Sequence, residues 1–248
     1  MKTGNRHLAM LLVLIFCFLS ASQGVIMAES SDNANGVYLL KKEQNYDSKG
    51  RRTLFYTYEY DRNGYLTKKT ERHSDTSVSY WLEYENDAKG NKVKETRCDE
   101  KGAGIYRLFE YDENGNMIRE TEYKKDGTQG AQWLNEYDVN GNMIKSSTVF
   151  SSGRLYSVDE YEYDDYGNEI RYILKDGSGT VSSAYSYEYE LREDGRPVVK
   201  TSYDSNHVIY RIRKYDYDEN GLLTTETVYD IDGQLIGHIE YFYMIPAV

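Results

Sequence analysis

Apolar and polar side chains alternate with a period of two along most of this chain. Phe109 and Tyr111 flank Glu110, and Tyr161 and Tyr163 flank Glu162 in the same way. The stretches that carry this alternation run for about 8 to 10 residues and are rich in Tyr, Thr, Ile and Val, which favour extended backbone. None of them shows a sustained period of 3.6. The pattern therefore predicts β-strands with two different faces.

Turn signals separate these stretches at regular intervals. A phrase typified by YEYDRNG and YDYDENG, in close or degraded copies, ends at Gly64, Gly90, Gly115, Gly141, Gly167, Gly195 and Gly221. A weaker series falls between them, at Gly50, Gly102, Gly127, Gly153, Gly179 and Gly233, with Thr76 and His207 in two further slots. Asp can accept backbone hydrogen bonds at the start of a turn, and Gly supplies the positive φ that closes it. The spacing predicts about 15 turns and about 16 strands, nearly all antiparallel to their neighbours.

The strong glycines recur every 25 to 28 residues, so each unit is a double hairpin. An open sheet seldom exceeds about 10 strands before it curls. We therefore predict an all-β fold, an antiparallel meander of about 16 strands in 26-residue repeats. A spiral, a roll and a closed barrel all satisfy the need to curl. We favour a spiral or roll-like sheet because no closing device is evident in the sequence.

The two faces of the predicted strands differ in chemistry. The opposite face to the aromatic side chains carries a column of acids that includes Glu59, Glu110 and Asp216. The aromatic face is the candidate ligand-binding surface, formed by Tyr58, Tyr60, Phe109, Tyr111, Trp133, Tyr137, Tyr161, Tyr163, Tyr215 and Tyr217. These rings either pack as the core of the sheet or serve as stacking platforms for sugars, since an aromatic ring with a polar tip suits both roles. Trp133 is the first candidate for a platform.

Cations follow five of the seven strong glycines by four residues. They are Lys68, Lys94, Arg119, Lys145 and Arg171. With one bulge at each turn, these cations would lie across from the aromatic pair and on its own face. The expected result is a series of cation–π contacts, each stabilising by roughly 0.5–1 kcal/mol.

The first 28 residues differ from the rest of the chain. Lys2 and Arg6 precede an apolar run over residues 8–19, and small residues follow it. A basic start, a short apolar run and small residues near a cleavage site are typical of a secretory signal peptide. The run of about 12 residues is shorter than the ~20 that a membrane-spanning helix needs. We interpret residues 1–28 as a signal peptide, 29–45 as a lead-in with the first strand, and 46–248 as one repeat domain, secreted or at the cell surface.

Net charge limits the classes of binding partner, and cysteine content limits the disulfides that the chain can form. The chain has a formal net charge of −11, and loss of Lys2 and Arg6 with the signal peptide lowers it to −13. Such a surface disfavours nucleic acids and anionic membranes, which attract basic proteins. After residue 28 the only cysteine is Cys98, so no intramolecular disulfide is expected. We also expect no further transmembrane segment.

Catalytic motifs are absent from the sequence. His73, His207 and His238 each stand alone, and no phosphate-binding loop, nucleophile elbow or HExxH is present. Residues 216–221 resemble the start of a calcium loop, but Thr227 stands where the last carboxylate ligand should be. We predict that the protein is not an enzyme and that it holds no cofactor or metal.

The phrase Y-x-Y-D-x-x-G-x-φ-x-x-x-T resembles the tyrosine–aspartate (YD, or Rhs) repeats of bacterial toxins and cell-surface proteins. The nearest copies are YEYDRNGYLTKKTE at 58–71 and YDYDENGLLTTET at 215–227, and the resemblance extends over about residues 46–243. It implies spiralling β-sheet shells or extended β-rods that enclose a toxin or bind carbohydrate at surfaces.

Three hypotheses for function follow. The leading one is an exported, non-catalytic scaffold that binds glycan or another cell-envelope polymer through the aromatic face. The alternative is a shell or stalk that packages or presents a protein partner or toxin. An outer-membrane barrel is disfavoured because Arg119 lies on one face of residues 116–123 and Glu120 and Glu122 on the other, leaving no apolar face for lipid.

Overall fold

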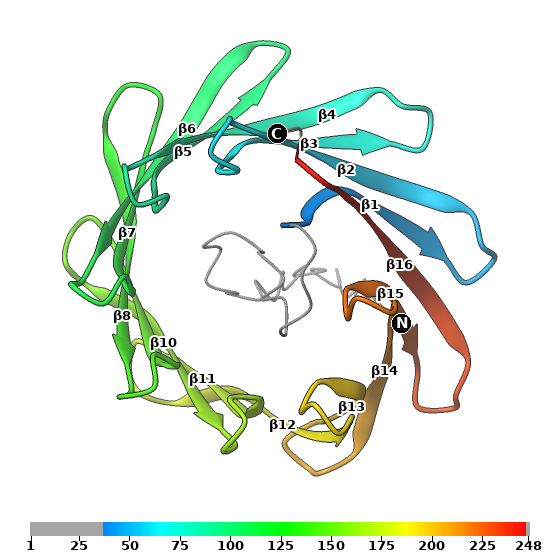
Figure 1. Ribbon diagram of the computed structural model, residues 1–248. Coiled ribbons are helices and arrows are strands. Elements are labelled where there is room, and N and C mark those ends of the chain that lie inside the picture. Colours follow the sequence, from blue (N-terminus) through cyan, green and yellow to red (C-terminus); the bar gives the residue numbers. More distant parts are fainter. Residues whose placement is uncertain (1–36, 247–248) are drawn as a thin grey trace, which may run out of the picture.

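The structure, a computed structural model, describes residues 37–246 as one closed barrel of sixteen antiparallel strands (Figure 1). The predicted signal peptide lies outside the described residues. The strands are β1 Leu39–Asp47, β2 Arg52–Tyr60, β3 Leu66–His73, β4 Val78–Asn86, β5 Lys92–Asp99, β6 Gly102–Tyr111, β7 Met117–Tyr123, β8 Gln129–Tyr137, β9 Met143–Val149, β10 Leu155–Tyr163, β11 Glu169–Asp176, β12 Val181–Leu191, β13 Pro197–Tyr203, β14 Ile209–Tyr217, β15 Leu223–Tyr229 and β16 Leu235–Met244. Each strand pairs with its neighbours in sequence, so the predicted meander and strand number are confirmed.

The prediction of a spiral or roll-like sheet is wrong, because the first and last strands pair with each other. β1 and β16 are antiparallel over a register that runs from Leu39 opposite Met244 to Asp47 opposite Gly237. Figure 1 shows these two strands side by side, which completes the ring. Pairing of the two ends leaves no unpaired sheet edge, and this removes the tendency of edge strands to associate with other chains.

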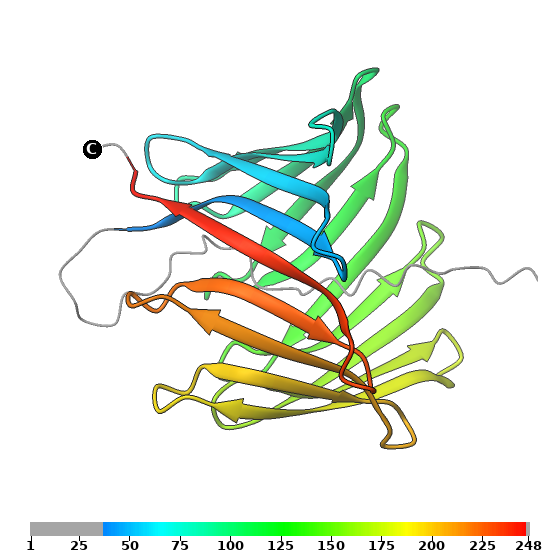
Figure 2. The same ribbon diagram turned by 90° about the vertical axis from the view of Figure 1, so that its right-hand side faces the viewer.

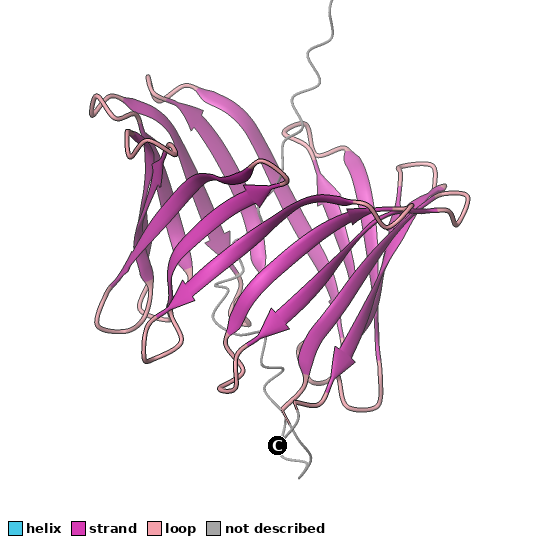
Figure 3. Cartoon of the chain, turned by 90° about the horizontal axis from the view of Figure 1, so that it is seen from above, coloured by secondary structure: helices cyan, strands magenta, loops and turns pink. Residues whose placement is uncertain are grey.

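The hairpin turns gather at the two ends of the barrel (Figures 2 and 3). We call one end the clamped rim; its turns are 61–64, 87–90, 112–115, 138–141, 164–167, 192–195 and 218–221. We call the other end the open rim; its turns are 47–50, 73–76, 99–102, 124–127, 150–153, 176–179, 204–207 and 230–233. β1 begins and β16 ends at the clamped rim.

Turn chemistry agrees with the sequence prediction at both rims. In the turn 112–115 the Gly115 N–H donates to the Asp112 carbonyl at 3.2 Å, and Gly115 has a φ of 87°. The Asp112 carboxylate accepts the backbone N–H groups of Asn114 and Asn116 at 2.9 and 2.8 Å. Thr76 and His207, with φ of 74° and 58°, take the glycine place in two turns as expected.

A second bulge beside each clamped-rim turn changes the predicted register. Arg119 pairs with Glu110 rather than with Phe109, because Ile118 is an extra residue in β7. Four of the five predicted cations therefore bind the acid column, in the pairs Glu85–Lys94, Glu110–Arg119, Glu136–Lys145 and Glu162–Arg171, at 2.7 to 3.0 Å. The fifth, Lys68, pairs with Glu59 across the strands and lies over the Trp81 ring. The prediction that these cations share the aromatic face is wrong.

The aromatic face is the inside of the barrel. Side chains converge on the concave side of a closed sheet, so side chains two strands apart can meet there and not on the outside. The Arg107 guanidinium of β6 lies 5.4 Å from the ring centre of Trp133 on β8, and the ring centres of Tyr185 on β12 and Tyr210 on β14 are 5.3 Å apart. We call this tyrosine-bearing face the inner wall and the acid-bearing face the outer wall.

Candidate binding site on the inner wall

All ten predicted aromatic residues lie on the inner wall, on the even-numbered strands β2, β6, β8, β10 and β14. These strands and the remaining ones add tyrosines beyond the ten predicted residues. These are Tyr56, Tyr80, Tyr84, Tyr172, Tyr185, Tyr187, Tyr189, Tyr241 and Tyr243. The inner wall is therefore richer in phenol groups than the sequence motif alone indicates.

Half of the predicted residues have a structural role. The tyrosine that directly precedes a clamped-rim turn donates its hydroxyl to a main-chain carbonyl of the preceding strand, as Tyr163 does to Met143 at 2.8 Å. The paired register of β9 and β10 ends before it reaches the rim, so the Met143 carbonyl has no backbone partner on β10. The tyrosine hydroxyl satisfies this carbonyl instead. The same bond joins Tyr60 to Leu40, Tyr111 to Lys92, Tyr137 to Met117, Tyr189 to Glu169, Tyr217 to Pro197 and Tyr243 to Leu223, at 2.7 to 3.0 Å.

Burial raises the pKa of these rim tyrosines, to about 12 for Tyr111 and Tyr163. The phenols are therefore neutral hydrogen-bond donors at physiological pH. We call this set of bonds the tyrosine clamps. Asn86 replaces the tyrosine in one unit and donates its amide to the Leu66 carbonyl at 2.8 Å.

Cation–π contacts occur on the inner wall, but they use cations that the sequence did not single out. The Lys69 ammonium lies 4.2 Å from the Tyr56 ring centre, and the Lys92 ammonium 4.2 Å from that of Phe109. The Arg107 guanidinium lies 5.4 Å from the ring centre of Trp133, the favoured platform. One face of the Trp133 ring is therefore occupied by a protein cation.

Arg107 is also the centre of a charged cluster on β5 to β7. Its guanidinium is 3.1 Å from Glu120, 3.6 Å from Glu122 and 3.9 Å from Glu95. Burial raises the pKa of Glu120, and the positive charge of Arg107 opposes this effect. These charges are bound to each other, which leaves them little capacity to hold a separate ion.

Away from the open-rim turns, charges on the strands of the inner wall are close to balanced. Seven cations point inward: Lys69, Lys92, Arg97, Arg107, Lys200, Arg211 and Arg213. Eight acids join them: Glu43, Glu71, Glu95, Glu120, Glu122, Asp159, Glu169 and Glu226. The inner wall thus offers hydroxyls, aromatic rings and mutually compensated charges.

Tyrosine rings contact each other along one arc of the inner wall. Tyr161 and Tyr172 have ring centres 5.5 Å apart, Tyr172 and Tyr185 6.1 Å, and Tyr185 and Tyr210 5.3 Å. We call these four residues, on β10, β11, β12 and β14, the tyrosine arc. The Tyr172 hydroxyl donates to Asp159 at 2.5 Å, which places a carboxylate beside the rings.

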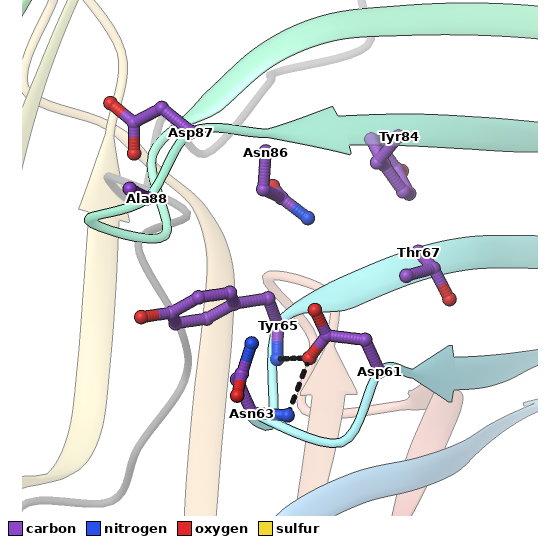
Figure 4. Close-up of a pocket in the computed structure, with 8 residues that line it drawn as sticks. All are labelled: Asp61, Asn63, Tyr65, Thr67, Tyr84, Asn86, Asp87 and Ala88. Atoms are coloured by element: carbon purple, nitrogen blue, oxygen red, sulfur yellow. Dashed lines mark hydrogen bonds between the residues drawn. The ribbon is translucent and has the colours of Figure 1, made fainter.

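A shallow polar pocket lies at the clamped rim between the turns 61–64 and 87–90 (Figure 4). Asp61 is already satisfied there, since it accepts the N–H groups of Asn63 and Tyr65 at 2.8 and 2.9 Å. The pocket is a gap between two consecutive turns. It adds no chemistry beyond that of the turns themselves.

No cluster of three or more His, Cys, Asp or Glu side chains among residues 37–246 has the geometry to hold a metal ion. Over the same residues, no helix has the length and hydropathy needed to cross a membrane.

Comparisons with known proteins show similarity of fold. The model of a family described as "Protein of unknown function (DUF2963)" matches residues 99–148. The crystal structure of a porin-like protein from Bacteroides uniformis is similar at 12% identity and a TM-score of 0.57, over 82% of this chain and 96% of that one. A porin-like protein from Bacteroides vulgatus gives 13% identity and a TM-score of 0.52, over 83% and 98% of the two chains. No protein with a curated description matches.

These comparisons define the class of the protein as a closed, all-β, antiparallel barrel. They also overturn the resemblance to the tyrosine–aspartate repeat family. The family model that matches is a different one, and the similar structures are porin-like proteins. A closed sixteen-strand barrel is also not the spiral that such repeats imply. The motif that suggested the resemblance is explained by local structure, because its tyrosine forms a clamp and its Asp and Gly form the turn.

Proposed function

We propose that the protein is an exported, non-catalytic scaffold that binds an uncharged, hydroxyl-rich polymer, a glycan of the cell envelope, on its inner wall. One observation carries this proposal. The inner wall combines aromatic rings with phenol and carboxylate hydrogen-bonding groups, and its charges compensate each other. Sugars present apolar C–H faces and hydroxyl edges, and an aromatic ring with a polar tip complements both.

The charge balance supports an uncharged ligand. A charged polymer would need an excess of the opposite charge to offset the loss of its hydration. Arg213 and Glu226, at 2.9 Å, and Arg107 with its three glutamates already satisfy one another inside the barrel. The neutral hydroxyl groups of a glycan can hydrogen-bond to such a surface without displacing these pairs.

The outer wall supports a location in the aqueous part of the envelope or at the cell surface. A barrel within a bilayer presents an apolar band about 25 Å tall to the lipid. Here Glu110–Arg119, Glu136–Lys145 and Glu162–Arg171 form an outward row of ion pairs. Residues 1–28 provide the proposed export signal.

The two tryptophans offer a matched test of binding, since Trp133 lies on the inner wall and Trp81 on the outer wall. Trp81→Phe leaves Trp133 as the only tryptophan, and Trp133→Phe leaves Trp81. Each variant of residues 29–248 is titrated with soluble neutral and acidic envelope polysaccharides while tryptophan fluorescence is recorded. We expect neutral polysaccharides to change the Trp133 signal, because the bound chain shares the inner wall with Trp133, and to leave the Trp81 signal unchanged.

The opposite pattern, a saturable change only in the Trp81 signal, would place binding on the outer wall. If neither signal changes and no polysaccharide is retained in a pull-down, glycan binding is refuted. A role in packaging or presenting a protein partner then becomes the better account.

A further inference from the structure

We infer that the saccharide binds at the tyrosine arc, on Tyr161, Tyr172, Tyr185 and Tyr210, and not at the Trp133 region of the same wall. This inference rests on the proposed function and narrows it to one subsite. The arc extends around the inner wall across β10 to β14, so a chain bound along it would cross the strands. It would take an uncharged sugar chain through its C–H faces.

The backbone under the arc explains why the rings can meet. Tyr185 and Tyr210 come from β12 and β14, which are separated by β13. Adjacent strands are about 4.8 Å apart, so side chains two strands apart start about 10 Å from each other. On β13, Ser202 pairs with Tyr187 of β12 and Arg211 of β14, close to the two tyrosines, and is a small side chain with 0% exposure. Because Ser202 is small, the two rings can lean over β13 until their centres are 5.3 Å apart.

Polar groups flank the arc at both ends. Near Tyr161 and Tyr172, the Asp159 carboxylate is a hydrogen-bond acceptor that already binds the Tyr172 hydroxyl at 2.5 Å. Near Tyr210, the guanidinium of Arg211, whose nitrogen atoms are all hydrogen-bond donors, lies 5.8 Å from the ring centre. The arc therefore has stacking surfaces in its middle, an acceptor at one end and a donor at the other.

The Trp133 region differs in what covers its rings. The Arg107 guanidinium lies over Trp133 and is held there by Glu120 and Glu122. A sugar that stacked on this face would have to displace a cation from three glutamates. In the arc the rings contact other tyrosines at 5.3 to 6.1 Å, and the cation beside them, Arg211, lies 5.8 Å from the centre of the end ring, Tyr210. Such a row presents the same type of ring along its length.

The arc is tested with the chain of residues 29–248 and with cellohexaose, maltohexaose and chitohexaose as uncharged probes. Tyr185→Ala removes the central ring, and we expect it to weaken binding of the retained probe at least tenfold. Tyr123→Ala is the matched control, because Tyr123 stacks on Tyr106 at 5.1 Å on the outer wall. We expect the control to leave the dissociation constant unchanged, with both variants checked by thermal melting.

A footprint on the unmutated chain gives a second readout in case Tyr185→Ala does not fold. Tyrosines are nitrated with and without the probe, and the modified positions are quantified by mass spectrometry. We expect the bound probe to protect Tyr185 and Tyr210 and to leave Tyr123 and Tyr156 unprotected.

The possible outcomes separate the two proposals. If a probe binds the unmutated chain, and Trp133→Ala abolishes binding while Tyr185→Ala does not, the arc is refuted and the proposed function stands. Protection of Tyr56 and Tyr80 instead of Tyr185 and Tyr210 has the same meaning. If no probe and no envelope polysaccharide binds the unmutated chain, the proposed function fails and the arc fails with it.

Discussion

The two rims of the barrel use the same turn chemistry but differ in how neighbouring turns contact each other. At five of the seven clamped-rim turns, a side chain in or just after the preceding turn reaches the glycine: the Tyr65 ring lies against Gly90, the Asn116 amide is 3.6 Å from the place of a Gly141 Cβ, and Arg196 donates to the Gly221 carbonyl. Gly115 of this rim has no such contact. At the open rim, a Cβ placed on Gly50, Gly102, Gly127, Gly153, Gly179 or Gly233 would meet nothing within 4 Å. Figure 3 shows both sets of turns.

The tyrosine clamps are also confined to the clamped rim. This difference explains why the clamped-rim turns are so regular in sequence and the open-rim turns so variable. Most clamped-rim turns fit a neighbour and supply a tyrosine, an aspartate and a glycine at fixed places, as in Tyr163, Asp164 and Gly167. The exceptions are Asn86 in place of the tyrosine and Arg192 in place of the aspartate. An open-rim turn needs only to reverse the chain, and Thr76 or His207 can do so without glycine.

The largest expected difference between the rims is in the cost of adding a methyl group to a turn glycine. Gly90 and Gly127 have φ of 88° and 84°, so alanine at either is strained by roughly 1–2 kcal/mol. At Gly90 the new Cβ would also overlap the Tyr65 ring. We expect Gly90→Ala to lower the free energy of unfolding by about 3 kcal/mol and Gly127→Ala by about 1 kcal/mol. Urea unfolding curves measure both; equal losses would contradict the contact between neighbouring turns.

The tyrosine clamps predict the next largest effect. Tyr163→Phe keeps the ring but leaves the Met143 carbonyl without its donor, so we expect a loss of about 1 kcal/mol in the free energy of unfolding. Tyr123→Phe, on the outer wall, is the control, and we expect it to be within about 0.3 kcal/mol of the unmutated chain. A clamp variant as stable as the control would mean that the ring alone holds the rim.

Acid should weaken the clamped-rim turns through their aspartates. The Asn142 side chain and backbone N–H groups lower the pKa of Asp138 below its ordinary value. A lowered pKa in the folded state gives stability that is full above the unfolded pKa of about 3.9 and is lost as pH falls through the folded pKa. We therefore expect the difference in melting temperature between Asp138→Asn and the unmutated chain to be greatest near pH 7 and to shrink below pH 4.

The open-rim turn that begins at Lys124 has no aspartate at that place, and Lys124→Gln is the control. We expect its small effect on the melting temperature to show no such change between pH 7 and pH 3. A constant difference for Asp138→Asn across this range would show that its carboxylate charge contributes nothing to the turn.

The ion-pair row of the outer wall should matter least. Glu136 and Lys145 are 2.7 Å apart with side chains 59% and 38% exposed, so water and salt screen their attraction. We expect Glu136→Gln to cost at most about 0.5 kcal/mol at low salt and less at 1 M salt. A loss as large as that of Tyr163→Phe would mean that the outer pairs, and not the clamps, hold the clamped rim.

Local features of this fold could be predicted from sequence, whereas long-range ones could not. Asp, Asn and Gly at fixed offsets predicted the turns, and even Thr76 and His207 were placed correctly. Closure depends on β1 and β16, which are far apart in sequence and share no motif. Gly237, where a Cβ would overlap the Tyr46 carbonyl across the seam, is not specific to closure, because Gly177 approaches the Leu155 carbonyl as closely within a hairpin. A glycine inside a strand can mark such a close approach of two backbones.

The register and part of the candidate site were missed for a related reason. The bulge at Ile118 is invisible in sequence because an extra isoleucine looks like any strand residue, yet it shifts Arg119 to the opposite face. The aromatic face was predicted from the repeated phrase. Tyr172, Tyr185 and Tyr210 lie outside that phrase, and only the pairing of β10 to β14 brings them together.

Closure of the sheet underlies the whole account, because it turns the aromatic face into an inner wall. Gln44 of β1 and Glu240 of β16 are directly opposite each other across the seam. The most direct measurement oxidises the variant Gln44→Cys/Glu240→Cys in a Cys98→Ser background and analyses it by non-reducing gel and peptide mapping. Gln44→Cys/Glu188→Cys, whose second cysteine is on β12, serves as the control. We expect the seam pair Gln44→Cys/Glu240→Cys to form an intramolecular disulfide in the monomer, and the control pair to form none. Its absence, or disulfides formed only between molecules, would contradict the closed barrel.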